Sequence, residues 1–176
     1  ILPPTFCDSR RLAVTLARDG VPTVAIATAE PSEGVLAVMI DDRHAAQDMT
    51  RHLIELGHRR IGFITGSENQ TASVGRLAGH EAALRAAAIP VDRDLIAKGD
   101  YTYRAGLRAA GQLLSLKRRP TAIFASNDDM AAAVVAAAHR AHLEVPADLS
   151  VAGFDDTTVA TTISPALTTI RQPAAD

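Results

Sequence analysis

The stretch that decides the fold class reads Thr121-Ala-Ile-Phe-Ala-Ser-Asn-Asp-Asp-Met-Ala-Ala-Ala-Val-Val-Ala-Ala-Ala138. Its first five residues, 121–125, form a short apolar run, which predicts a strand buried on both faces of a sheet. A polar turn follows, and the alanine-rich segment 130–142 then predicts a helix. Because a buried strand that leads into a helix is the repeating unit of parallel sheets, this stretch predicts an α/β fold.

The same alternation extends along the chain in both directions. We expect further strands at 24–26, 35–40, 61–65 and 149–153, and helices at 43–56, from about 76 to 88 and at 103–116. The helix at 43–56 has apolar residues at three- and four-residue spacing, and Gly57 lies where its C-terminal cap should be. The pattern therefore predicts parallel sheets with helices packed on both faces.

Composition excludes several classes of protein. Hydrophobic residues make up 47 % of the 176 residues and charged residues 22 %, which is typical of a globular domain and not of a disordered chain. The net charge of −2 gives this chain no basic surface for DNA or anionic lipid. No apolar run reaches the roughly 18 residues of a membrane span. The single cysteine, Cys7, cannot form an internal disulfide, so we expect a cytoplasmic protein.

Three pairs of aspartates lie at or just after the ends of predicted strands: Asp41-Asp42, Asp128-Asp129 and Asp155-Asp156. In open α/β sheets the ligand site lies at the carboxyl ends of the strands, so these acceptors should converge on one edge. An alternative is that they only cap the helices that follow, with Asn127 or Ser126 as the cap before Asp128. Asp155 precedes no clear helix, which favours a binding role for that residue.

An arginine and a tyrosine complete the set of candidate binding residues. Arg76 follows the loop 66–75, and its planar guanidinium could bind a pair of hydroxyls, a carboxylate or a phosphate. Tyr101 lies in the loop 99–104, where an aromatic ring could stack on a sugar or a base. A solvated arginine and a tyrosine that packs in the core remain the alternatives. Carboxylate acceptors with one arginine and one ring suit a neutral, polyhydroxylated ligand.

Little in the sequence supports an enzymatic function. The six histidines show no metal-binding spacing, and there is no nucleophile elbow, dinucleotide turn or phosphate-binding loop. We expect no catalytic residues, no metal and no cofactor. A Mg²⁺-dependent phosphoryl-transfer enzyme remains a distant alternative, but it would need a lysine at the end of a central strand. The only two lysines, Lys98 and Lys117, are not predicted to lie there.

Five ordered motifs, spread over nearly the whole chain, resemble the effector-binding region of the lactose-repressor family of bacterial transcription regulators. They are His52-Leu-Ile-Glu-Leu-Gly-His-Arg-Arg-Ile-Gly-Phe-Ile-Thr-Gly66, Arg76-Leu-Ala-Gly79, Pro120-Thr-Ala-Ile-Phe-Ala-Ser-Asn-Asp-Asp-Met130, Val145-Pro-Ala-Asp-Leu-Ser-Val-Ala-Gly-Phe-Asp-Asp156 and Pro165-Ala-Leu-Thr-Thr-Ile-Arg-Gln-Pro173.

The resemblance implies a periplasmic-binding-protein-like fold, in which two α/β lobes enclose a ligand cleft. Residues 1–40 would belong to an incomplete first lobe, 41–170 to the second lobe, and 171–176 to the return into the first. Operator DNA would be bound only by an N-terminal helix-turn-helix headpiece, which this chain lacks. Since the chain begins with Ile1 and not with methionine, we expect it to be a piece of a longer protein.

The resemblance also implies which residues contact the effector: Arg76, Asn127, Asp155, Tyr101 and, as in some members, Asp41. One departure is that the usual Asp-Asn pair at the lobe crossing is Asp41-Asp42 here. We expect an uncharged sugar as the effector and a homodimeric, cytoplasmic regulator that binds its ligand without turnover. A periplasmic sugar-binding protein of a transporter is the alternative with the same fold.

The helix 128–142 carries the predicted dimer interface. At 100° per residue, Met130, Val134, Ala137 and Ala141 should face the sheet. The opposite face, Ala132, Val135, Ala136 and His139, is also mostly apolar, and family members pair partly through this helix. We therefore expect a second copy of the chain to cover Val135. An alanine-rich surface exposed to solvent is the alternative.

Overall fold

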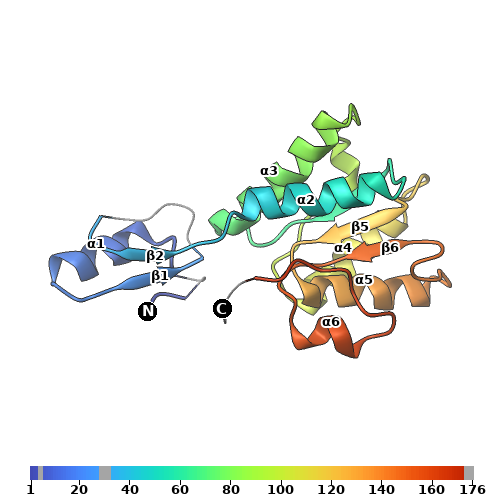
Figure 1. The fold of residues 1–176 in the computed structure, drawn as a ribbon. Coiled ribbons are helices and arrows are strands. Elements are labelled where there is room, and N and C mark those ends of the chain that lie inside the picture. The colour runs from blue at the N-terminus through green and yellow to red at the C-terminus, as the bar shows by residue number, and fades with distance from the viewer. Residues whose placement is uncertain (4–5, 28–32, 173–176) are drawn as a thin grey trace.

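The computed structural model describes residues 1–3, 6–27 and 33–172, and Figure 1 shows the two α/β units that they form. The elements, in chain order, are α1 (Arg10–Arg18), β1 (Val24–Ile26), β2 (Leu36–Val38), α2 (Asp42–Glu55), β3 (Ile61–Ile64), α3 (Thr71–Ala86), the short 3₁₀ helix η1 (Arg93–Leu95), β4 (Ile96–Ala97), α4 (Tyr103–Leu114), β5 (Ala122–Ala125), α5 (Asp128–Arg140), β6 (Ser150–Ala152) and α6 (Thr158–Thr162).

The larger unit is built on a four-stranded sheet with the order β4-β3-β5-β6, and all of its strands are parallel. Alternate residues of β5 point to opposite faces, as the two-residue period of a strand requires. Ile123 and Ala125 pack with α4 and α5, whereas Ala122 and Phe124 pack with α2 and α3. Helices therefore cover both faces of the sheet, and the predicted α/β class is confirmed.

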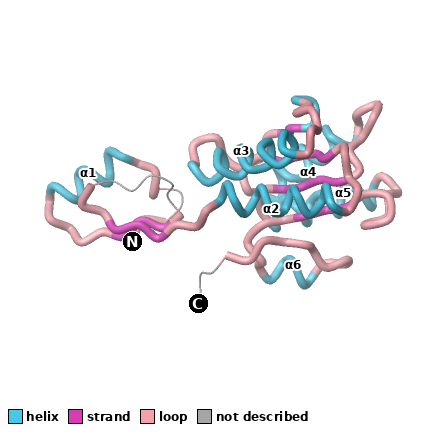
Figure 2. Tube along the Cα trace, turned by 45° about the horizontal axis from the view of Figure 1, so that its top comes forward, coloured by secondary structure: helices cyan, strands magenta, loops and turns pink. Residues whose placement is uncertain are grey.

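The smaller unit contains β1, β2 and α1. The two strands are parallel, and Leu2 extends the sheet by a bridge to Ala25. Among the described residues of this unit, the buried apolar cluster consists of Leu2, Cys7, Ala13, Ala25 and Val35. Residues 39–41 connect this unit to the start of α2 (Figure 2).

The two units also make a direct polar contact. The carboxylate of Asp8 accepts hydrogen bonds from the backbone N–H of Thr71, at 2.8 Å, and from the Thr71 hydroxyl. Gln70, at the N-cap position of α3, makes no side-chain capping bond, so Asp8 supplies from the other unit an acceptor for the exposed N–H groups of that helix.

Several element boundaries differ from the sequence-based expectation. The second strand is only Leu36–Val38, because its pairing with β1 covers three residues. Helix α3 begins at Thr71, within the predicted loop. Arg76 therefore lies in the second turn of a helix and not directly after a loop. Helices α1 and α6 and the edge strand β4 were not predicted. Ser9 caps α1, so a local signal for that helix exists in the sequence.

The structure corrects the predicted faces of α5. Val135 is only 4 % exposed and Ala132 is buried, both within a single chain. Val135 belongs to the core cluster against which Ile163 and Leu167 pack, and α6 lies against α5. A second copy is therefore not needed to cover Val135. Of the predicted interface, Ala136 is half-buried and His139 exposed, while Ala141, predicted to face the sheet, is exposed.

Candidate functional site

Polar side chains gather at the carboxyl ends of β3, β5 and β6, at the end of the sheet that the aspartate pairs predicted. We call the set Asp42, Arg76, Tyr101, Asn127 and Asp155 the rim cluster. Its members come from the start of α2, the second turn of α3, the loop before α4, the residue before α5 and the turn after β6. Residues far apart in sequence therefore meet because parallel strands all end on the same edge.

Arg76 is the centre of the rim cluster and is 5 % exposed. Its Nε donates to Asp42 Oδ1 at 2.7 Å, and its Nη1 donates to the carbonyl oxygen of Ser126. Asp155 Oδ1 lies 3.7 Å from the same Nη1. The guanidinium carbon also lies 3.6 Å from the centroid of the Phe154 ring, a cation–π contact. Arg76 is thus held in place by the protein and is not a solvated arginine.

Asp155 has an unusual backbone conformation that aims its carboxylate at this cluster. Its φ is +110°, and its backbone N–H donates to the carbonyl oxygen of Ile170 at 2.8 Å. Asp155 Oδ1 accepts a hydrogen bond from Gln172 Nε2 at 2.5 Å. Burial raises the pKa of Asp155 to about 6, although the nearby charge of Arg76 acts in the opposite direction.

Asp128 holds the turn that carries Asp155. Its side chain is fully buried and accepts hydrogen bonds from the Thr157 backbone N–H at 2.7 Å and from the Thr169 hydroxyl at 2.6 Å. The acid therefore does more than cap a helix, because it ties the segment after β6 to the returning chain. The cap of α5 is Asn127, as one of the sequence-based alternatives proposed.

Asn127 joins that cap to the Tyr101 loop. Its Oδ1 accepts from the Met130 backbone N–H at 3.0 Å, and its Nδ2 donates to the Tyr101 carbonyl oxygen at 2.9 Å. Tyr101 has a positive φ of 71°, and its ring lies directly over Gly66. A Cβ atom at Gly66 would come within 2.0 Å of the ring, so only glycine permits this approach. Asn127 therefore positions the tyrosine.

The crossing residues Asp41 and Asp42 have separate roles. Asp41 is exposed, and its side chain caps α2 by accepting from the His44 backbone N–H at 2.9 Å. Asp42 points to Arg76 instead and is largely buried, and this burial raises its pKa while the charge of Arg76 opposes the rise. The resemblance implied Asp41 as the effector contact, and Asp42 was expected at this edge only as a member of the pair Asp41-Asp42. Ser126, Phe154 and Gln172 were not expected to contact the site residues. The signal for Asp42 in the sequence was its place at the end of a predicted strand.

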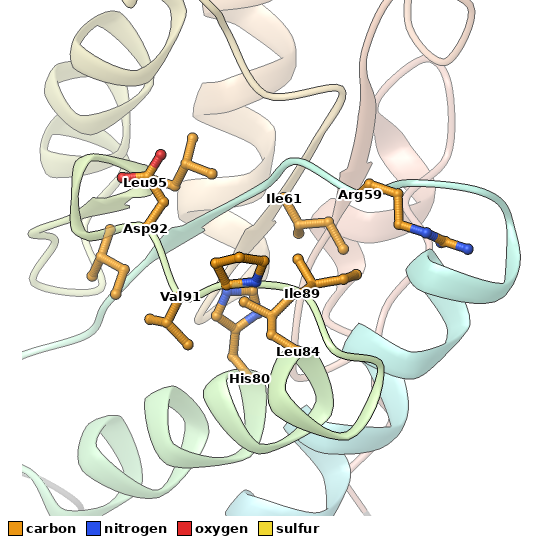
Figure 3. Close-up of a pocket in the computed structure, with 10 residues that line it drawn as sticks. Arg59, Ile61, His80, Leu84, Ile89, Val91, Asp92 and Leu95 are labelled. Carbon is orange, nitrogen blue, oxygen red and sulfur yellow. The ribbon is translucent and has the colours of Figure 1, made fainter.

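A second buried polar group lies away from the rim, between α3 and the sheet. His80 lines a small pocket with Ile61, Leu84 and Ile89, shown in Figure 3. Its space of about 10 Å³ has room for roughly one water molecule. His80 Nδ1 is 3.0 Å from the Thr50 hydroxyl, and the ring stacks on Phe63. Burial lowers the pKa of His80 to about 3, so the ring is neutral near pH 7.

The described part of the chain has neither a cluster of metal-binding side chains nor a membrane-spanning helix. Residues 1–3, 6–27 and 33–172 contain no group of three histidine, cysteine or acidic side chains arranged to hold a metal ion. Within the same ranges, none of the helices has both the length and the hydropathy that a membrane crossing requires.

Comparison with known proteins identifies the family. Residues 50–176 match the family described as a periplasmic binding protein-like domain. A sugar-binding transcriptional regulator of the LacI family from Escherichia coli, solved in complex with phosphate, superposes with a TM-score of 0.84 at 31 % identity, over 93 % of this chain and 59 % of that chain. The chain belongs to the lactose-repressor family.

The chain is also similar to other regulators of this kind. The transcriptional regulator CelR in complex with cellobiose has a TM-score of 0.87 at 37 % identity, over 94 % of this chain and 51 % of that chain. Catabolite control protein A of Priestia megaterium is 38 % identical over 162 residues, which are 92 % of this chain and 49 % of that protein. The repressor CytR of Escherichia coli K12 is 46 % identical over 136 residues, 77 % of this chain and 40 % of that protein.

The chain thus spans about half the length of the curated lactose-repressor family relatives that it matches. CytR is named as a transcriptional repressor and CelR as a transcriptional regulator, and neither is named as an enzyme or a transport protein. The periplasmic alternative is accordingly less supported than the regulator.

Proposed function

We propose that this chain is the effector-binding part of a bacterial transcription regulator, and that a small sugar binds at the rim cluster. The observation that carries the proposal is the meeting of Arg76, Asp155 and Tyr101 at the carboxyl end of a parallel sheet, beside a second α/β unit. Ligands of open α/β sheets bind at that end of the strands. The headpiece that contacts operator DNA would lie outside this chain.

An uncharged sugar is the effector class that best fits these side chains. Carboxylate oxygens accept hydrogen bonds from sugar hydroxyls, and an aromatic ring stacks on the apolar face of a sugar. Two similar regulators support this class, because one was solved with cellobiose and another is described as sugar-binding. The ligand would be bound and released unchanged in the cytoplasm, where the operator is.

A change in the angle between the two units would transmit ligand binding. Residues 39–41 form a short connection, and the hydrogen bonds from Thr71 to Asp8 form a second, breakable one. A ligand that binds one arrangement more tightly shifts the population toward it. In a homodimer this shift would alter the spacing of two headpieces on a palindromic operator.

The first prediction tests the ligand class and the site in the full-length protein. A thermal-shift screen against a panel of neutral sugars should find a ligand that raises the melting temperature, since a ligand that binds only the folded state stabilises it. Calorimetry should then show that Asp155→Asn weakens this ligand roughly 10- to 150-fold, because a hydrogen bond to a charged group contributes about 1.5 to 3 kcal/mol.

Asn at position 155 keeps the size of the side chain and tolerates a positive φ. The matched control is Asp129→Asn, which removes one charge from an exposed residue near the same end of the sheet. Asn127→Ala is a poorer test, because it also removes the cap of α5. If Asp155→Asn and Asp129→Asn bind the sugar as tightly as the wild type does, the site is wrongly assigned. If no sugar binds the wild type, the ligand class is wrong.

A further inference from the structure

The position of Arg76 raises the question of which charge the rim cluster can accept. A free guanidinium binds phosphate or carboxylate groups through two parallel N–H donors. In this chain the Nε donor is directed to Asp42 at 2.7 Å, and Nη1 is directed to the Ser126 carbonyl oxygen with Asp155 3.7 Å away. Two of the guanidinium nitrogens that could bind an anionic ligand therefore already donate to the protein.

The charges around Arg76 also disfavour an anion. Two carboxylates, Asp42 and Asp155, surround this one guanidinium, and the fully buried Asp128 lies behind them with its oxygens bonded to Thr157 and Thr169. An anion that entered the cluster would meet a net negative charge in a partly buried place, where charges are screened less than in water.

Three other cations of the larger unit are paired with carboxylates. Arg171 pairs with Asp156 at 2.5 Å. Beside the edge strand β4, a hollow of about 310 Å³ is lined by Thr65, Glu68, Ser73, Val74, Arg93 and Lys98. There Lys98 pairs with Glu68 at 2.5 Å, and Arg93 pairs with Glu81 at 2.9 Å.

We propose that Asp42 is a specificity-determining residue: by holding Arg76 in an ion pair, it makes the rim cluster reject phosphorylated and acidic ligands and select uncharged ones. This inference rests on the proposed function, because it assumes that the effector binds at the rim cluster. Asparagine at this position would leave Arg76 as a cation without a carboxylate on its Nε. Replacing the carboxylate of residue 42 with a carboxamide would then change which class of ligand the site accepts.

The experiment uses inorganic phosphate as the probe, so that it does not depend on knowing the effector. Full-length wild type, Asp42→Asn and the control Asp129→Asn are titrated with phosphate at constant ionic strength, and affinity is measured by calorimetry and by thermal shift. We expect Asp42→Asn to bind phosphate saturably and at least roughly tenfold more tightly than the wild type, because it removes the carboxylate charge that neutralises Arg76 and repels an anion. The control, which removes the same charge without contacting Arg76, should behave like the wild type.

A double variant, Asp42→Asn with Arg76→Gln, should lose the gained phosphate affinity, which assigns the new site to Arg76. The variant Asp42→Ser also removes the carboxylate and keeps the test available if Asp42→Asn does not fold. Equal phosphate affinity in wild type and the Asp42 variants, or no phosphate binding in any of them, would overturn the inference. A sugar screen of the wild type that finds no ligand, with the phosphate gain intact, would instead contradict the proposed sugar-sensing function alone.

Discussion

At the scale of single residues, His80 shows how burial determines the charge of a group outside the binding site. The side chain lies between α3 and the sheet, with Phe63 stacked on it at 4.8 Å and the Thr50 hydroxyl at hydrogen-bond distance. A protonated imidazole would have to give up its hydration here without a carboxylate partner, which is why its pKa falls to about 3. Its neutral form therefore supports the contact between α2 and α3.

This burial predicts a specific loss of stability in acid. The unfolded chain takes up a proton at His80 below the ordinary histidine pKa of 6.5, whereas the folded chain does so only near 3. The free energy of unfolding therefore falls as the pH drops through this window, by about 2 kcal/mol between pH 6.5 and 5. Denaturant unfolding of His80→Gln should lack this fall. The exposed His52→Gln is the control and should retain it.

Asp155 titrates in the opposite sense, since its raised pKa stabilises the folded protein as the pH falls through about 6. Comparing variants with the wild type at each pH cancels this contribution. If His80→Gln and wild type lose stability in parallel between pH 6.5 and 5, His80 is not buried as described.

At the scale of elements, the packing of α2 on α3 fixes the position of Arg76 relative to Asp42. The two helices approach so closely at Gly79 that an added Cβ atom would lie 2.1 Å from the Arg43 carbonyl oxygen. Arg43 follows Asp42 directly and Gly79 lies one turn after Arg76, so the same contact that brings the backbones together also sets the length of the ion pair.

We therefore predict opposite effects for two glycine substitutions in helices. Gly79→Ala should lower the free energy of unfolding by about 1 to 3 kcal/mol, because α2 must move away to admit the methyl group. Gly111→Ala, in α4, has open space around its Cβ position and should raise the free energy of unfolding by up to about 1 kcal/mol through helix propensity. Chemical denaturation of both variants checks this. A stabilised Gly79→Ala would show that the helices do not meet there.

At the scale of the whole molecule, the proposed homodimer depends on which part of α5 remains accessible. Val135 packs inside the chain with the help of α6 and the segment after it, so it no longer distinguishes a dimer from a monomer. The half-buried Ala136 and the exposed His139 stay on the outer surface of the helix. A dimer through α5 would use these residues.

Two variants of the full-length protein should distinguish a loss of dimerisation from a loss of folding stability. Ala136→Glu should weaken the dimer at least roughly tenfold in sedimentation, because it places an unpaired charge in a contact between copies. Val135→Ala should instead lower the free energy of unfolding by about 2 kcal/mol, since it removes buried methyl groups. The exposed Gln112→Glu serves as the control for added charge. If the wild type is a dimer and Ala136→Glu remains one at the same concentration, this surface is not the dimer interface.

Local sequence patterns were enough to predict the α/β class, the strand and helix of the segment 121–138, and the edge of the sheet where the polar residues gather. These features depend on neighbours in sequence, because residue period, capping and turn chemistry act within a few residues. Arg76, Tyr101 and Asp155 were accordingly singled out from their places after predicted strands or at loop ends, whereas Asn127 was expected in the site only from the family resemblance. The family motifs were readable for the same reason.

The contacts between side chains that are far apart in sequence could be identified only in the folded structure. Arg76 and Asp42 are 34 residues apart, Thr71 and Asp8 are 63 apart, and the burial of Val135 depends on α6, which was not predicted. Such contacts result from the packing of whole elements against one another, and the local residue pattern of each element is compatible with many partners. For that reason Asp41 and Asp42 look equivalent in the sequence, yet one caps a helix and the other holds the arginine of the rim cluster.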